Sequence, residues 1–245
     1  MSSDKKANRM LALILVALAL GAISGYGAGY FIQNKRISEL ESQLMEAEQD
    51  LKALNDSFAA LNKSYSTLAR LAAEVHEIYL KVASESAEAF YAFSASMYEE
   101  RTEKQIDLLE EALHHIDACI PMLENLSQIY QELSKEFPVH RDIYEKYGRF
   151  IQAELKFMYG ERKLVNATIL LFRVILEVEE ADELQKDRWL SMLEESKEVY
   201  EEALDLMEEA SRIAPEIRMK YEAEELHINY LLDLLYEFKD ILTEA

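Results

Sequence analysis

The sequence predicts an all-α protein with a single N-terminal transmembrane helix, a coiled-coil stalk and an antiparallel helical bundle of about four to five long helices. Its 245 residues include only three prolines and six glycines, so little interrupts a helix. Apolar residues recur at helical spacing along most of the chain, and residues 10–32 form one uncharged apolar run. We therefore expect a short tail at 1–9, an anchor at 10–32, a stalk at 34–82 and a bundle at 83–245.

The apolar run at residues 10–32 is the predicted membrane anchor. At ~1.5 Å per residue it would extend roughly 34 Å, which is enough for a ~30 Å hydrocarbon core. Lys5, Lys6 and Arg9 precede it and favour a cytoplasmic N-terminus. The alternative is a cleaved signal peptide ending near Gly25. Both interpretations export the rest of the chain, so we expect a single-pass cell-membrane protein that is mostly extracytoplasmic.

Three glycines within this run, Gly21, Gly25 and Gly29, repeat every four residues and share one helix face. Such a face lets two helices approach closely in lipid, which makes these residues candidates for transmembrane packing. The alternative is that glycine is simply common in membrane helices.

Four Asn-x-Ser/Thr motifs support an exported location. Their asparagines are the candidate N-glycosylation sites Asn55, Asn62, Asn125 and Asn166. The net charge of −21 argues against nucleic acid as a partner. Cys119 is the one cysteine, so no intrachain disulfide can form, and we expect a buried thiol.

The stalk is predicted from apolar residues at alternating steps of three and four, the a and d positions of a heptad repeat. The a positions are Ile37, Leu44, Leu51, Phe58, Tyr65 and Ala72, and the d positions are Leu40, Ala47, Leu54, Leu61, Leu68 and Val75. The flanking e and g positions offer no opposite charges between identical parallel chains. These a and d residues form one apolar seam along the stalk helix. The seam could pack against a second copy, a different protein or the chain's own bundle.

Helix boundaries in the bundle follow from prolines and polar residues. We expect the stalk helix to end near Arg101 and Thr102 to cap the next helix. Pro121 should kink or split that helix, Pro138 should mark the next boundary, and Gly160 is a candidate break.

The second half of the bundle is also predicted to be helical. Residues 167–176 are almost wholly apolar but too short to span a membrane, so they should form a buried core helix. A helix at about 183–213 should follow, and Pro215 should open the last one. The last helix carries apolar residues on most sides and is expected to lie centrally.

Residues 200–215 resemble the second helix of a tetratricopeptide repeat. Ala203, Met207, Ala210 and Pro215 match that spacing, but the preceding helix does not fit and no second copy appears at a 34-residue period. The resemblance covers about sixteen residues, so we interpret this segment as an ordinary helical hairpin.

Two Glu-x-x-His pairs are the nearest approach to a chemical motif. Paired motifs of this kind hold two metal ions in some four-helix bundles. Glu111 and His114 lie on a polar face, whereas Glu224 shares a face with apolar residues, which leaves Glu224 and His227 as weak candidate metal ligands. We assign no metal site, catalytic residue or cofactor, and expect no enzyme.

The function expected from these features is that of a membrane-anchored extracytoplasmic helical scaffold, or protein-interaction protein, with a protein partner or a second copy bound through the coiled coil. The alternative is a ligand-binding or sensory bundle coupled to a membrane partner, and a di-metal carboxylate enzyme is the third hypothesis. The 14 tyrosines either pack the core or line a ligand pocket. A pocket lined by tyrosines and holding a small molecule would favour the sensory bundle, and a closed core with a flat apolar surface patch would favour the scaffold.

Overall fold

The computed structural model describes the backbone of residues 3–180 and 185–244, and the side-chain surroundings of residues 33–178 and 185–243. This part of the chain is all-helical and contains no strand, which confirms the predicted fold class. Its elements in order are α1 (Ser3–Tyr98), α2 (Thr102–Glu136), a 3₁₀ turn (Pro138–His140), α3 (Arg141–Glu180), α4 (Lys186–Ile213), a second 3₁₀ turn (Pro215–Ile217) and α5 (Arg218–Glu244).

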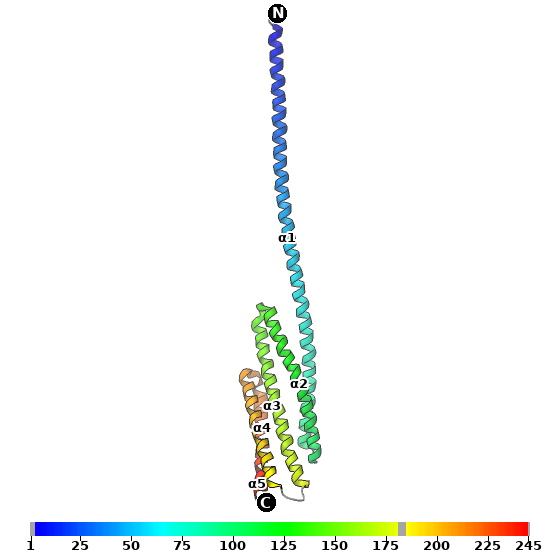
Figure 1. The fold of residues 1–245 in the computed structure, drawn as a ribbon, viewed down its shortest axis with the longest axis vertical. Coiled ribbons are helices and arrows are strands. Elements are labelled where there is room, and N and C mark those ends of the chain that lie inside the picture. Colours follow the sequence, from blue (N-terminus) through cyan, green and yellow to red (C-terminus); the bar gives the residue numbers. More distant parts are fainter. Residues whose placement is uncertain (1–2, 181–184, 245) are drawn as a thin grey trace. The chain divides into compact units, whose positions relative to one another are not determined.

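The chain divides into two compact units, Met1–Tyr65 and Ser66–Ala245. In the first unit the described residues form a single helix. In the second, the end of α1 and helices α2 to α5 pack side by side (Figure 1). Short connections join α2 to α3 and α4 to α5, and each pair packs together, so neighbouring helices are antiparallel.

Two of the three prolines act as the sequence predicts. Pro138 and Pro215 each open a short 3₁₀ turn between two long helices. Pro121 does not split its helix, because α2 is continuous from Thr102 to Glu136. The prediction of a break at Gly160 is also wrong, since α3 continues through it.

Gly160 has a packing role instead. A Cβ atom built there would lie 2.6 Å from Cγ of Met207 and 3.1 Å from the carbonyl oxygen of Ala203. Both residues belong to α4, so the missing side chain lets α3 and α4 approach closely.

The predicted cap at Thr102 is wrong. Arg101 occupies the N-cap position with extended backbone and makes no side-chain cap hydrogen bond, and Thr102 is already the first helical residue. The turn is held differently: the Gln105 side chain donates to the Glu99 carbonyl oxygen at 2.8 Å. This bond satisfies a carbonyl oxygen in the turn before α2, whereas an N-cap hydroxyl would have accepted from backbone N–H groups of the first helical turn.

Helix α3 is the wall shared by two hydrophobic cores. Ile151, Met158 and Val165 face the core formed with α1 and α2, whereas Phe157 and Leu164 face the core formed with α4 and α5. Residues 167–176 contribute to both cores, and most of them are buried, as the sequence predicts for a core helix.

A buried chain of hydrogen bonds links α3 to α4. Tyr200 donates its hydroxyl to Oγ1 of Thr168 at 3.0 Å, and Thr168 donates to the Leu164 carbonyl oxygen at 2.8 Å. Ser196 donates to the Ala167 carbonyl oxygen at 2.8 Å. Burial raises the pKa of Tyr200 well above its ordinary value, so the hydroxyl keeps its proton and remains a donor.

The predicted stalk seam does not behave uniformly along α1. Leu68, Val75, Tyr79 and Val82 pack against the core that α1 shares with α2 and α3. The seam residues of the first unit are instead exposed. Ala47 is exposed, and the large residues among them are each more than half accessible: Ile37, Leu40, Leu44, Leu51, Leu54, Phe58, Leu61 and Tyr65.

The last helix is not central as predicted. α5 packs mainly on α4 and only slightly on α3. Ile228, Leu231 and Leu235 are buried, but Leu226 and Ile241 are exposed at 73% and 62%. The apolar residues on the other sides of α5 therefore lie at the surface of the bundle.

In the described part of the chain, no helix combines the length and apolar character needed to cross a membrane. The predicted anchor at residues 10–32, with Gly21, Gly25 and Gly29, falls outside the residues whose side chains are described.

Candidate functional site

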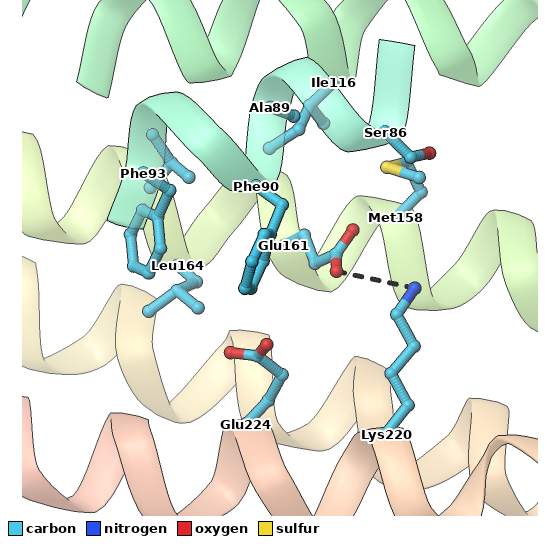
Figure 2. Close-up of a pocket in the computed structure, with 11 residues that line it drawn as sticks. Ser86, Ala89, Phe90, Phe93, Ile116, Met158, Glu161, Leu164, Lys220 and Glu224 are labelled. Carbon is cyan, nitrogen blue, oxygen red and sulfur yellow. Dashed lines mark ion pairs between the residues drawn. The ribbon is translucent and has the colours of Figure 1, made fainter. Parts of the chain in front are cut away.

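A cavity of about 230 Å³ lies in the second unit between the end of α1, α3 and α5. Most of its wall is apolar, but three ionisable side chains also line it, Glu161 from α3 and Lys220 and Glu224 from α5. Figure 2 shows these three groups and the Phe90 ring gathered around one space. The remaining lining residues are Ser86, Ala89, Phe93, Ile116, Met158, Leu164 and Val165.

The charged wall exists because of helix periodicity. Lys220 and Glu224 are four residues apart on α5, and Glu154 and Glu161 are seven apart on α3, so each pair shares one helix face. Nζ of Lys220 lies 3.6 Å from Oε2 of Glu154 and 3.5 Å from Oε1 of Glu161. It also lies 4.2 Å from the centre of the Phe157 ring. The lysine is therefore held by two carboxylates and an aromatic face.

Burial affects the pKa values of Lys220 and Glu161 differently. Burial alone would lower the pKa of Lys220, but Glu161 and Glu154 outweigh it and raise that pKa above its ordinary value. Burial also raises the pKa of Glu161, against the opposing effect of Lys220. Lys220 therefore stays protonated and positively charged, whereas burial disfavours the ionised form of Glu161.

Glu224 is the least compensated group in the cavity. Its Oε2 atom is buried and has no hydrogen-bond partner, and no other side-chain atom in the described residues shares that condition. Burial, with the nearby charge of Glu161, raises its pKa to about 7. A carboxyl group is costly to bury ionised without a partner, so near neutral pH this site is poised between its two protonation states.

A second hollow of about 580 Å³ adjoins the first and shares Phe90, Phe93 and Glu224 with it. His227 lines this hollow, and its ring lies 5.1 Å from the Phe93 ring. Burial lowers the pKa of His227, so the imidazole is favoured in its neutral form. The two weak candidate metal ligands, Glu224 and His227, therefore both face hollows at one end of α5.

The other Glu-x-x-His pair does not join them. Glu111 and His114 are exposed on α2, and the partly buried neighbour His115 instead contacts Oε2 of Glu85 at 2.7 Å. Within the described residues, no three His, Cys, Asp or Glu side chains come together in a way that could hold a metal ion.

The four candidate glycosylation sites all lie on helices. Asn55, Asn62 and Asn125 are exposed, and Asn166 is partly buried, with its side-chain nitrogen donating to the Arg162 carbonyl oxygen at 2.9 Å. None of the four lies in the wall of the cavity.

Sequence reasoning identified Glu224 and His227 but missed Glu161, Lys220 and Phe90. The sequence does hold a partial indication, because the four-residue spacing of Lys220 and Glu224 on an apolar helix predicts a polar spot on a packed face. It holds no indication that α1 supplies a phenylalanine to the same space. No tyrosine lines this cavity, but Tyr98 and Tyr230 line the adjoining hollow, so the tyrosine-lined pocket considered from the sequence stays a prediction.

No protein-family model, curated protein or solved structure matches this chain. Two features of its own residues therefore bear on its function, the exposed seam of the first unit and the cavity of the second.

Proposed function

We propose that this protein is a membrane-anchored extracytoplasmic scaffold that binds a second copy of itself through the seam of its first unit. The observation that supports this proposal most directly is the exposed row of large apolar side chains at a and d positions. An isolated helix with such a row is marginal in water, and pairing it buries the row. Residues 37–65 would give about four heptads and roughly 43 Å of paired helix.

A second copy is the occupant that fits the rest of the sequence best. Two chains anchored by residues 10–32 in one membrane would have the same orientation and the same height, which favours a parallel pair in register. The face of Gly21, Gly25 and Gly29 would let the anchors approach as well. The e and g positions are acidic or uncharged and offer no opposite-charge pairs, so the stability of such a pair would come from the apolar seam. Asn55 and Asn62 both lie at e positions beside that seam, where glycans would crowd a partner.

Cysteine cross-linking of the full-length chain in its membrane tests the seam. In a Cys119→Ser background, Leu51→Cys at an a position should form a disulfide-linked dimer on mild oxidation, because the two sulfur atoms would face each other across the seam. Gln49→Cys, on the opposite side of the helix, is the matched control and should remain monomeric. Equal cross-linking of the two variants, or none with Leu51→Cys, would contradict the second-copy proposal, and a mixed product of another mass would identify a different partner.

The anchor and the exported location are part of the same proposal and need a separate test. Support comes from the apolar run, the basic residues that precede it and the four glycosylation motifs. Protease treatment of intact cells, with mass analysis of Asn55, Asn62, Asn125 and Asn166, should show a digested body and at least one glycan in a host that glycosylates asparagine. Full protection of the body with unmodified asparagines would place it in the cytosol and overturn the exported location.

The cavity favours a second candidate function, a ligand-binding bundle coupled to a membrane partner. A hollow with a few convergent polar groups in a mostly apolar wall is the usual form of a small-molecule site, and this one is partly open to solvent beside Phe90. Both functions can be present in one protein, because the seam lies in residues 37–65 and the cavity lies in the second unit.

A further inference from the structure

We propose that the cavity between α1, α3 and α5 binds a small primary amine with an apolar body, whose ammonium group lies between the carboxylate of Glu224 and the ring of Phe90. This site is independent of the seam and of the anchor, so it can be present or absent whatever the outcome of the tests above.

The size of the cavity limits the ligand. An engineered apolar cavity of about 150 Å³ accepts benzene. The cavity here, at about 230 Å³, has room for one aromatic ring and a short alkyl chain. Phe93, Met158 and Leu164 supply the apolar wall against which such a body would pack.

The charge of the cavity selects a cation. With Glu154, the surrounding groups are three carboxylates and one ammonium. Lys220 is already shared between Glu154 and Glu161, which leaves Glu224 without a cationic partner of its own. A ligand ammonium would donate to the unpartnered Oε2 atom of Glu224 and remove the cost of burying it ionised.

The aromatic ring of Phe90 makes an organic ammonium a better fit than a simple ion. Figure 2 shows this ring next to the carboxyl groups of Glu161 and Glu224, and Phe90 is 71% exposed, so the ring belongs to the solvent-accessible part of the cavity wall. A cation over an aromatic face is stabilised by the ring quadrupole, and the neighbouring contact of Lys220 with Phe157 uses the same interaction in this bundle. An anionic ligand would meet Glu161 and Glu224 together and is disfavoured.

Titration calorimetry on the full-length protein in detergent micelles tests the site directly. The probe is 2-phenylethylamine at pH 8, where Glu224 is mostly ionised. Its matched controls are the neutral 2-phenylethanol and the anionic 3-phenylpropanoate, both titrated also into empty micelles. We expect one amine per chain, an affinity at least tenfold higher than that of the alcohol, and no binding of the carboxylate. Equal affinity for amine and alcohol would overturn the proposal, because it would show an apolar void without charge selection.

Two variants then locate the ammonium. Glu224→Gln should lower the affinity for the amine at least tenfold and leave that for the alcohol unchanged. Glu222→Gln removes the same charge from an exposed position on α5 and should have no effect. Phe90→Leu should weaken amine binding severalfold, since it keeps an apolar side chain but removes the ring.

The fluorescence of the buried Trp189 verifies that each variant is folded. If Glu224→Gln is folded and binds the amine as tightly as the unmodified protein, the proposed site is wrong. If Glu222→Gln weakens binding as much as Glu224→Gln, the attraction comes from the overall negative charge of the protein, and the site is again wrong.

Discussion

Replacing Glu224 by glutamine should stabilise the bundle relative to the unmodified protein, and this gain should be larger at pH 8 than at pH 5. The pKa of this carboxyl group is raised to about 7 from an ordinary value of 4.5, so the folded state holds its proton more tightly than the unfolded chain does. Its contribution to stability is fully present below pH 4.5 and is lost as the pH rises through 7. Glutamine has no proton to lose and therefore avoids that loss.

The size of the effect follows from the same two values. An interval from 4.5 to about 7, at ~1.4 kcal/mol per tenfold change, gives roughly 3 kcal/mol. Since the side chain is only partly buried, water screens part of this, and a gain of about 1–3 kcal/mol at pH 8 is expected. The charged neighbours that could alter this value are Glu161 on α3 and Lys220 on the same helix, while α1 contributes the uncharged Phe90 and Phe93.

Urea unfolding followed by Trp189 fluorescence measures this difference. Trp189 is the one tryptophan of the chain, and it is buried in the core that α3, α4 and α5 form. Unfolding free energies of the unmodified protein, Glu224→Gln and the exposed control Glu222→Gln are compared at pH 5 and pH 8. A difference between the first two that is the same at both pH values, or that is larger at pH 5, would refute the reasoning.

Other substitutions and conditions test neighbouring features. Gly160→Ala should lower the free energy of unfolding by about 1–3 kcal/mol, because its Cβ would overlap the side chain of Met207; an unchanged urea midpoint would mean that α3 and α4 separate without cost. Tyr200→Phe should lower it by about 1–2 kcal/mol, because Thr168 loses its hydroxyl partner in a buried place; a thermal melt identical to that of the unmodified protein would contradict this. The affinity for 2-phenylethylamine should rise from pH 5 to pH 8 as Glu224 ionises while the amine remains charged, and calorimetry showing a constant affinity would separate amine binding from that carboxyl group.

The helices were largely predictable from the sequence because their determinants are local. Few glycines and prolines favour helix throughout, and Pro138 and Pro215 mark true boundaries. The predictions were wrong where packing between helices, and not local sequence preference, decides the structure. Pro121 does not split α2, while a kink there stays a prediction, and Gly160 is explained by the close approach of α4 and not by a break in α3.

The cavity could be predicted only in part. Apolar spacing places Glu224 beside Ile228 and Leu231 on the packed side of α5, and that much follows from a period of 3.6 residues. Which side chains of α1 and α3 meet Glu224 depends on how three helices are rotated and shifted against one another. That geometry is set by long-range packing, so Phe90 and Glu161 carried no local indication of their role.

The seam shows why one pattern can have two outcomes. Its heptad spacing continues unchanged from Ile37 to Val75, so the sequence predicts one uniform stalk. In the second unit, Leu68 and Val75 lie beside the apolar faces of α2 and α3 and pack there. The spacing of apolar residues predicts which face of a helix will be buried. It does not predict which surface will cover that face.

Cys119 gives this bundle a natural kinetic reporter. Its thiol is fully buried on α2, where it lies 3.5 Å from the hydroxyl of Ser86 on α1, and burial raises its pKa. An alkylating reagent can reach the sulfur only when the core formed by α1, α2 and α3 opens, so the labelling rate reports the open population when reclosing is faster than alkylation. The free energy of opening this core can thus be compared with and without a ligand, a membrane or a partner, through the cysteine that the chain already carries.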